Sequence, residues 1–232
     1  MGNLYIVATP IGNLQDITLR AIKVLQSVDV IACEDTRKTG ILLSQILPPD
    51  TQKPKLVSFY EQNELQRIPE VISALKDDLN IALVSDAGTP TVSDPGFKLV
   101  RECIREGIKV ESIPGASSVI TALTLSGLPT DKFLFVGYPP KKPGHRETLF
   151  QKLTELPIKT TIIIFEGPHH LLRTLNELKK AFGDIDIAIC REITKIYEET
   201  RREKISESIK HFEKTEPKGE FVILLNKFVS KE

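Results

Sequence analysis

Short apolar runs alternate with amphipathic segments through the first half of the chain, and this order limits the folds that are open to it. The runs have the length of strands, and the segments between them have helical spacing. Such alternation predicts βα units and a mainly parallel sheet. The predicted strands are residues 4–8, 28–33, 56–58, 81–85 and 109–113, and the predicted helices are residues 18–27, 36–45, 65–77 and 96–106.

The second half has more strands than helices. Its strand candidates lie at residues 133–137, 160–165, 187–191, 195–200 and 220–225, with only three helical stretches among them. This ratio predicts a mixed sheet in a second domain. A strand meets two breakers at Ile113-Pro114-Gly115, before a helix of small residues at 116–126. We therefore predict an α/β protein with two domains, residues 1–114 and 115–232.

Composition and missing motifs exclude several classes of protein. No apolar run has the length of a membrane span and the start lacks a secretory signal, so we expect a cytoplasmic protein. The 31 basic and 31 acidic residues give no net charge, so a nucleic acid would have to meet a local patch. There is no G-x-G-x-x-G, P-loop, H-E-x-x-H or Cys/His cluster, which disfavours dinucleotide, phosphate-loop and metal sites. Ser117 and Ser118 lack a G-x-S-x-G context and are typical of a helix start.

A strand that ends in a tight polar turn suggests a ligand site at residues 81–90. The apolar run breaks into Asp86-Ala87-Gly88-Thr89-Pro90. Gly88 would let the backbone approach a ligand, and Asp86 would lie at the carboxyl end of the strand, where open α/β sheets bind small molecules. Asp94-Pro95 has the pattern of a helix N-cap followed by proline at the first helical position.

Two more polar turns follow predicted strands, at residues 8–16 and 33–37. Because parallel strands place their carboxyl ends on one edge, the three turns should meet there. The polar side chains expected at this edge are Asn13, Asp16, Glu34, Asp35, Arg37, Asp86 and Asp94.

Several motifs occur in an order typical of one family. They are A-T-P-I-G-N-L-x-D, E-D-T-R, S-D-A-G-T-P-x-x-S-D-P-G, P-G-A-S-S, F-E-G-P-H and R-E-I-T-K-x-Y-E-E, between Leu4 and about Leu225. Together they resemble the ribosomal RNA small subunit methyltransferase I family of the tetrapyrrole methylase superfamily. His170 stands where that family commonly has arginine, and family members often continue beyond the last strand.

The resemblance implies a class III methyltransferase fold, usually a homodimer, with S-adenosylmethionine in the cleft between its two domains. It further implies a role in rRNA processing, by methylation of a cytidine ribose 2′-hydroxyl near the decoding region of 16S rRNA. The residues that it assigns to the cofactor are Pro10, Ile11, Asp86, Ala87, Gly88, Thr89, Ser117, Ser118, Ala122, Phe165, Glu166 and Ala188.

The acceptor hydroxyl needs a group that removes or orients its proton. Asp35 is the first choice among Asp16, Glu34 and Asp35, with Arg37 positioning phosphate or ribose and Lys195 or Glu166 contributing from the second domain. Alternatively, E-D-T-R is only a helix cap and a surface ion pair.

A proline-rich loop at residues 138–146 carries three fixed cations, Lys141, Lys142 and Arg146, and the aromatic Tyr138. Such a loop can contact RNA phosphates while its tyrosine stacks on a base, although a solvated surface loop has a similar composition. We also assign Asn13, in the first polar turn, to the substrate.

Two other functions stay open at this point. One is a methylase of the same fold that acts on a tetrapyrrole, which would need a broad apolar cleft with few cations. The other is a cofactor-binding module without turnover, which would have no need of carboxylates beside the cofactor turn.

Overall fold

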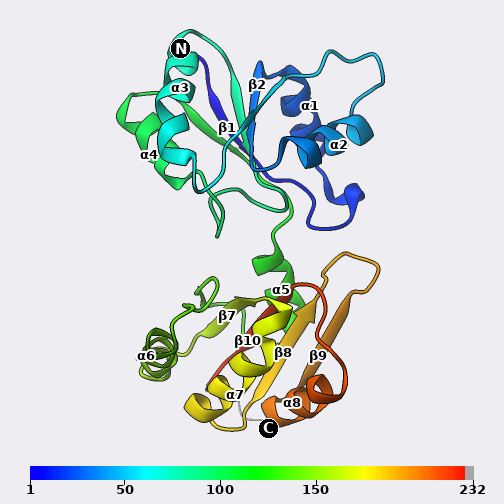
Figure 1. The fold of residues 1–232 in the computed structure, drawn as a ribbon, viewed down its shortest axis with the longest axis vertical. Coiled ribbons are helices and arrows are strands. Elements are labelled where there is room, and N and C mark those ends of the chain that lie inside the picture. Colours follow the sequence, from blue (N-terminus) through cyan, green and yellow to red (C-terminus); the bar gives the residue numbers. More distant parts are fainter. Residues whose placement is uncertain (228–232) are drawn as a thin grey trace. The chain divides into compact units, whose positions relative to one another are not determined.

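The computed structural model describes residues 1–227 and divides the chain into two compact units. The first unit is Met1–Ser117, and the second begins at Ser118. Each unit has its own five-stranded sheet (Figure 1). The units divide in the connection between β5 (Val110–Ile113) and α5 (Ser118–Ser126), the same connection that contains the predicted breakers Pro114 and Gly115.

The sheet of the first unit has the strand order β3-β2-β4-β1-β5, and every neighbouring pair is parallel. Besides β5, its strands are β1 (Leu4–Val7), β2 (Val30–Cys33), β3 (Lys55–Ser58) and β4 (Ile81–Val84). The predicted parallel sheet is confirmed, and all five strands end at one edge.

Helices cover both faces of this sheet (Figure 1). One face packs against α1 (Leu19–Ser27) and α2 (Thr36–Ile46), and the other packs against α3 (Glu64–Lys76) and α4 (Phe97–Arg105). Neighbouring strand residues point to opposite faces, so β1 sends Leu4 and Ile6 into one core and Val7 into the other. A short 3-10 helix, η1 (Leu14–Asp16), lies in the turn after β1.

The predicted cap of α4 is wrong. The helix begins at Phe97, and its cap residue is Gly96 with φ 121°, so Asp94 and Pro95 lie in the preceding turn. The carboxylate of Glu64, on α3, accepts a hydrogen bond from the Gly96 amide at 3.0 Å. A side chain from another helix therefore supplies the acceptor that local sequence assigned to Asp94.

The second sheet has the order β6-β7-β10-β8-β9 and is mixed, as predicted. Only β6 and β7 run parallel, and the other pairs are antiparallel. The predicted strand at 195–200 is displaced, because residues 192–198 form a turn in which Glu192 and Thr194 have positive φ. The strands are β6 (Phe133–Phe135), β7 (Thr161–Glu166), β8 (Asp186–Arg191), β9 (Glu199–Lys204) and β10 (Phe221–Leu225).

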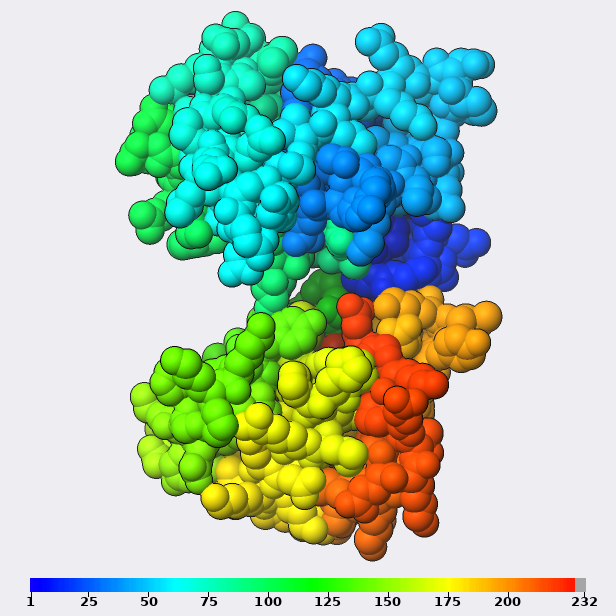
Figure 2. Space-filling model, in the orientation of Figure 1, coloured from blue at the N-terminus to red at the C-terminus, as the bar shows by residue number. Residues whose placement is uncertain are grey.

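Three helices pack on one face of the second sheet, and α5 contacts strands β8, β9 and β10 through residues of the opposite face. The three are α6 (Pro143–Thr154), α7 (Leu171–Phe182) and α8 (Ile205–Lys214), with the 3-10 helix η2 (Pro168–His170) leading into α7. Figure 2 shows α7 at the surface of this unit between α6 and α8. Among residues 1–227, no helix has the length and apolar character needed to cross a membrane.

Candidate functional site

Three loops are joined by hydrogen bonds at the carboxyl edge of the first sheet. Thr9, after β1, exchanges two backbone hydrogen bonds with Gly88, after β4, at 2.8 and 3.1 Å. The hydroxyl of Thr89 donates to the carbonyl of Ala116, after β5, at 3.0 Å. Because β1 and β4 are neighbours at the centre of the sheet, these bonds fix the loops where open α/β sheets bind ligands.

Gly88 occupies a conformation and a space that a side chain would disturb. Its φ is 83°, in the left-handed region that L-residues avoid. A Cβ atom there would lie 3.2 Å from Cγ2 of Ile11 and 3.9 Å from the carbonyl oxygen of Ala116. The cofactor residues predicted in the first unit therefore share one edge: Pro10, Ile11, Asp86, Ala87, Gly88, Thr89 and Ser117.

Glu34 and Asp86 connect the loops after β2 and β4 reciprocally. The Asp86 amide donates to Oε2 of Glu34 at 2.8 Å, and the Asp35 amide donates to Oδ1 of Asp86 at 3.2 Å. Lys38 Nζ bonds Oδ2 of Asp86 at 2.7 Å. We did not predict Lys38 from the sequence, although its place in the first turn of a helix that starts at this edge is the signal that points to it.

Two carboxyl groups at this edge have raised pKa values. Burial raises the pKa of Asp94 to about 6, with contributions from the negative charges of Glu34 and Asp86 and an opposing hydrogen bond from Ser85. Burial also raises the pKa of Glu34, again with a contribution from Asp86, against the Asp86 amide and Lys38. Carboxyl groups whose pKa is shifted toward neutral pH are enriched at functional sites.

Asp35 has the features of the alternative interpretation, in which it caps a helix and forms an ion pair. It is the N-cap of α2, where its carboxylate accepts the Arg37 amide at 2.9 Å. The Arg37 guanidinium bonds both carboxylate oxygens, at 2.7 and 3.1 Å. Hydrogen bonds from Arg37 hold the pKa of Asp35 well below its usual range. The catalytic assignments of both residues stay predictions.

Apart from the residues of the predicted RNA-binding loop, the site residues predicted in the second unit lie on strands β7 and β8, on α5 and in the turn before β9. Ala122 and Ala188 are buried, and Phe165 packs edge-on against the rings of Phe135 and Tyr138, at 4.7 and 5.5 Å between centres. Lys195 lies in the turn at 192–198, where its ammonium pairs with Glu192 and Glu220 at 2.9 and 3.0 Å. The same ion pairs raise its pKa against the effect of burial.

The structure corrects the predicted RNA-binding loop at Arg146. Helix α6 begins at Pro143, so the irregular segment is residues 138–142, which we call the basic loop. Lys141 and Lys142 are exposed in it, whereas Arg146 lies inside the helix with only 3 % of its surface exposed. Its guanidinium is turned inward, to Glu177 at 2.7 Å, and therefore is not placed to bind phosphate. Asn13 is exposed and caps η1, accepting the Gln15 amide at 3.0 Å.

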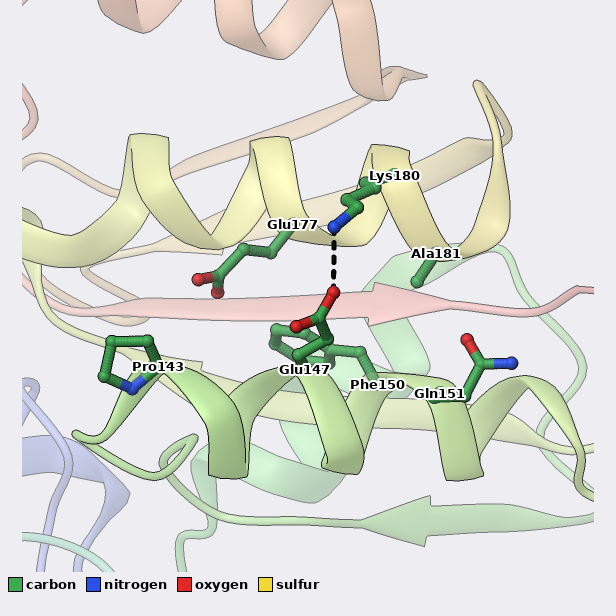
Figure 3. A pocket seen from close by; sticks show the side chains of 7 residues that line it. All are labelled: Pro143, Glu147, Phe150, Gln151, Glu177, Lys180 and Ala181. Atoms are coloured by element: carbon green, nitrogen blue, oxygen red, sulfur yellow. Dashed lines mark hydrogen bonds and ion pairs between the residues drawn. The ribbon is translucent and has the colours of Figure 1, made fainter.

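A surface groove of about 210 Å³ lies between α6 and α7, over the ring of Phe150 (Figure 3). An ion pair of 2.8 Å between Lys180 and Glu147 bridges it. None of the predicted site residues line this groove. Within residues 1–227, no group of three or more His, Cys, Asp or Glu side chains is arranged to hold a metal ion.

Comparison with known proteins assigns the chain to a family. Residues 3–208 match the family model of the tetrapyrrole (corrin/porphyrin) methylases. The ribosomal RNA small subunit methyltransferase I of Thermotoga maritima is 46 % identical over 97 % of this chain and 99 % of its own length. The protein of the same name from Halalkalibacterium halodurans is 44 % identical over 97 % of this chain and 75 % of its own length.

Solved structures show the same fold at low sequence identity. Uroporphyrin-III C-methyl transferase from Thermus thermophilus, complexed with S-adenyl homocysteine, has a TM-score of 0.65 and 17 % identity over 96 % of this chain and 97 % of its own. The methyltransferase CobJ has a TM-score of 0.73 and 15 % identity over 100 % of this chain and 97 % of its own. The fold, the motifs and the full-length relatives agree, and the chain belongs to the ribosomal RNA small subunit methyltransferase I family of the tetrapyrrole methylases.

Proposed function

We propose that this protein is an S-adenosylmethionine-dependent methyltransferase that methylates the 2′-hydroxyl of a cytidine ribose in 16S rRNA, near the decoding region. The full-length similarity to proteins named ribosomal RNA small subunit methyltransferase I carries this proposal. The three loops joined at Gly88 support it, because they provide a fixed, backbone-lined edge for a cofactor.

The residues of the first unit fit S-adenosylmethionine chemically. Gly88 leaves open the space that a Cβ would fill beside Ile11. The carboxylates of Glu34 and Asp86 give this edge a negative charge, which suits the cationic sulfonium and ammonium groups of the cofactor. When bound, the cofactor supplies a methyl group on a sulfonium that is a good leaving group. The residues that would hold it are Pro10, Ile11 and the turn from Asp86 to Thr89, with Ser117, Ser118, Ala122, Phe165, Glu166 and Ala188 as further predicted contacts.

The protein's part in the chemistry is to align the acceptor and to take up its proton. The lowered pKa of Asp35 makes it a weak base and suits it to orienting the hydroxyl. Glu34, whose pKa is raised, is the better proton acceptor of the two. Arg37 has 86 % of its side chain exposed, so it is accessible to a phosphate beside the reacting ribose. In this proposal Lys195, in the second unit, is a further catalytic residue.

The basic loop provides the RNA contact. Lys141 and Lys142 are exposed, and Lys142, the N-cap residue of α6, makes no capping hydrogen bond through its side chain. A helix start with two neighbouring cations attracts phosphate. The exposed ring of Tyr138 offers a surface on which a base can stack.

A tetrapyrrole substrate is the second candidate, because the solved structures that share the fold include a uroporphyrin-III C-methyl transferase. The relatives that are more than 40 % identical carry the rRNA name, which favours RNA. We further propose that the protein works as a homodimer in the cytoplasm, and sedimentation at micromolar concentration tests the dimer.

Labelled S-adenosylmethionine and purified small ribosomal subunits test the function directly. We expect label in 16S rRNA, and mass spectrometry of nuclease fragments should place it on the ribose of one cytidine. Uroporphyrinogen III in place of the subunits should stay unlabelled. Label on the tetrapyrrole, or label on a base instead of a ribose, would overturn the proposal.

A further inference from the structure

Arg146 lies at the centre of a buried polar network in the second unit. It donates from Nε to Glu177 at 2.7 Å and from Nη2 to the Thr174 hydroxyl at 2.5 Å. Nη2 also lies 3.6 Å from Oε2 of Glu166, a carboxylate that is itself only 4 % exposed and accepts the Thr174 hydroxyl. The guanidinium carbon is 5.7 Å from the centre of the Phe150 ring. These partners come from β7, α6 and α7, so they fix the guanidinium relative to all three elements.

The same guanidinium contacts the basic loop. Its Nη1 donates to the carbonyl of Pro140 at 3.4 Å. The loop is also fixed at its first residue, because the ring of Tyr138 packs against Phe165 on β7. Its two lysines follow Pro140 directly and are exposed. The network therefore reaches the backbone of the residue that precedes the predicted phosphate contacts.

Arginine is required for this arrangement on chemical grounds. Its planar fork has five N–H donors and can bond several acceptors in fixed directions, whereas a lysine ammonium acts as a point charge on a flexible stem. A buried charge also needs all of these partners, which leaves the side chain few alternative positions.

We infer that Arg146 is a positioning residue, which holds the basic loop in the orientation that brings Lys141 and Lys142 to rRNA phosphates. This inference rests on the proposed function, because it assumes that the loop binds rRNA. It gives Arg146 a role in RNA affinity without contact between its side chain and the RNA.

The conservative variant Arg146→Lys tests the inference. We expect its affinity for 16S rRNA to fall about tenfold, the effect of one lost hydrogen bond to a charged group. The salt dependence of binding should weaken as well, as we expect for Lys141→Ala/Lys142→Ala. Adding Arg146→Lys to the double lysine variant should cause no further loss, because both changes act through the same loop.

Arg173→Gln is the matched control, since Arg173, at the surface of α7, donates to the other carboxylate oxygen of Glu177 at 2.9 Å. It should leave RNA affinity unchanged. If circular dichroism shows that Arg146→Lys does not fold, Glu177→Gln weakens the same network from a partly exposed position and should lower RNA affinity in the same way.

Two results would overturn the inference. One is an RNA affinity equal to the parent's in a folded Arg146→Lys variant or, if that variant does not fold, in Glu177→Gln. The other is a further, additive loss of RNA affinity when Arg146→Lys is added to Lys141→Ala/Lys142→Ala. Both leave the proposed function standing if the parent protein still methylates small subunits. Failure of the parent protein to do so refutes the function itself.

Discussion

Replacing Gly88 with alanine tests whether the turn after β4 binds the cofactor. Alanine at φ 83° costs about 1–2 kcal/mol of conformational strain. Its Cβ would also lie 3.2 Å from Cγ2 of Ile11, so the turn or Ile11 must shift by a few tenths of an ångström. In the free protein the turn can relax and release this strain, and cofactor binding restores it. Affinity for S-adenosylmethionine should therefore fall about 5–30-fold, the equivalent of 1–2 kcal/mol.

Gly107→Ala is the matched control for backbone strain. Gly107 follows α4 with φ 69°, and an added Cβ there would have no heavy atom within 4 Å. Gly107→Ala should melt about 2–8 °C below the parent, as expected for 1–2 kcal/mol in a chain of this size, whereas Gly88→Ala should melt closer to the parent because its turn relaxes in the free protein. Titration calorimetry should then show weaker cofactor binding in the Gly88 variant alone. Equal affinity in the two variants and the parent would refute the assignment of this turn to the cofactor.

Three further predictions concern charged groups of the site. Asp35→Asn keeps the cap of α2, so we expect parent stability; a single-turnover methylation rate close to the parent's would assign this carboxylate to the helix alone. Because the pKa of Asp94 is about 6 when folded and 3.8 in its reference state, the folded protein binds more protons between these values, and stability should fall as pH rises through that window. Asp94→Asn should remove this loss, so its melting temperature should exceed the parent's at pH 7.5 but not at pH 4. Lys141→Ala/Lys142→Ala should lower the slope of log affinity for RNA against log salt concentration by about 1.4, which is about 0.7 for each lost phosphate contact. An unchanged slope would mean that the loop is only a surface feature.

Sequence periodicity was sufficient for the parallel sheet, because β1 to β4 are short apolar runs that are each followed by an amphipathic helix. The run at residues 81–85, for example, ends within one residue of β4 (Ile81–Val84). The polar turns after β2 and β4 were also placed on one edge correctly, since strand direction alone decides that. Glu34 and Asp86 do bond each other's loops there.

Predictions failed where a distant residue changed the local preference. The Asp94-Pro95 pattern favours a helix start, but Glu64 lies thirty-two residues earlier and bonds Gly96 instead. Arg146 resembled a solvated loop cation because prolines and lysines precede it. Its spacing to Phe150 and Leu153 is the i, i+4, i+7 pattern of a buried helix face, and this signal could have revealed it.

The strand order has a consequence for the protein during its synthesis. Among residues 1–227, strand β1 pairs only with β4 and β5, and both follow residue 80 in the sequence. At about 5–20 residues per second, β1 therefore waits roughly 4–15 s on the ribosome before Ile81–Val84 can join it. During this time the segment Tyr5-Ile6-Val7 exposes apolar side chains and unpaired backbone groups. The same topology that places the Gly88 turn beside β1 leaves this first strand without its partners until the middle of the chain has been made.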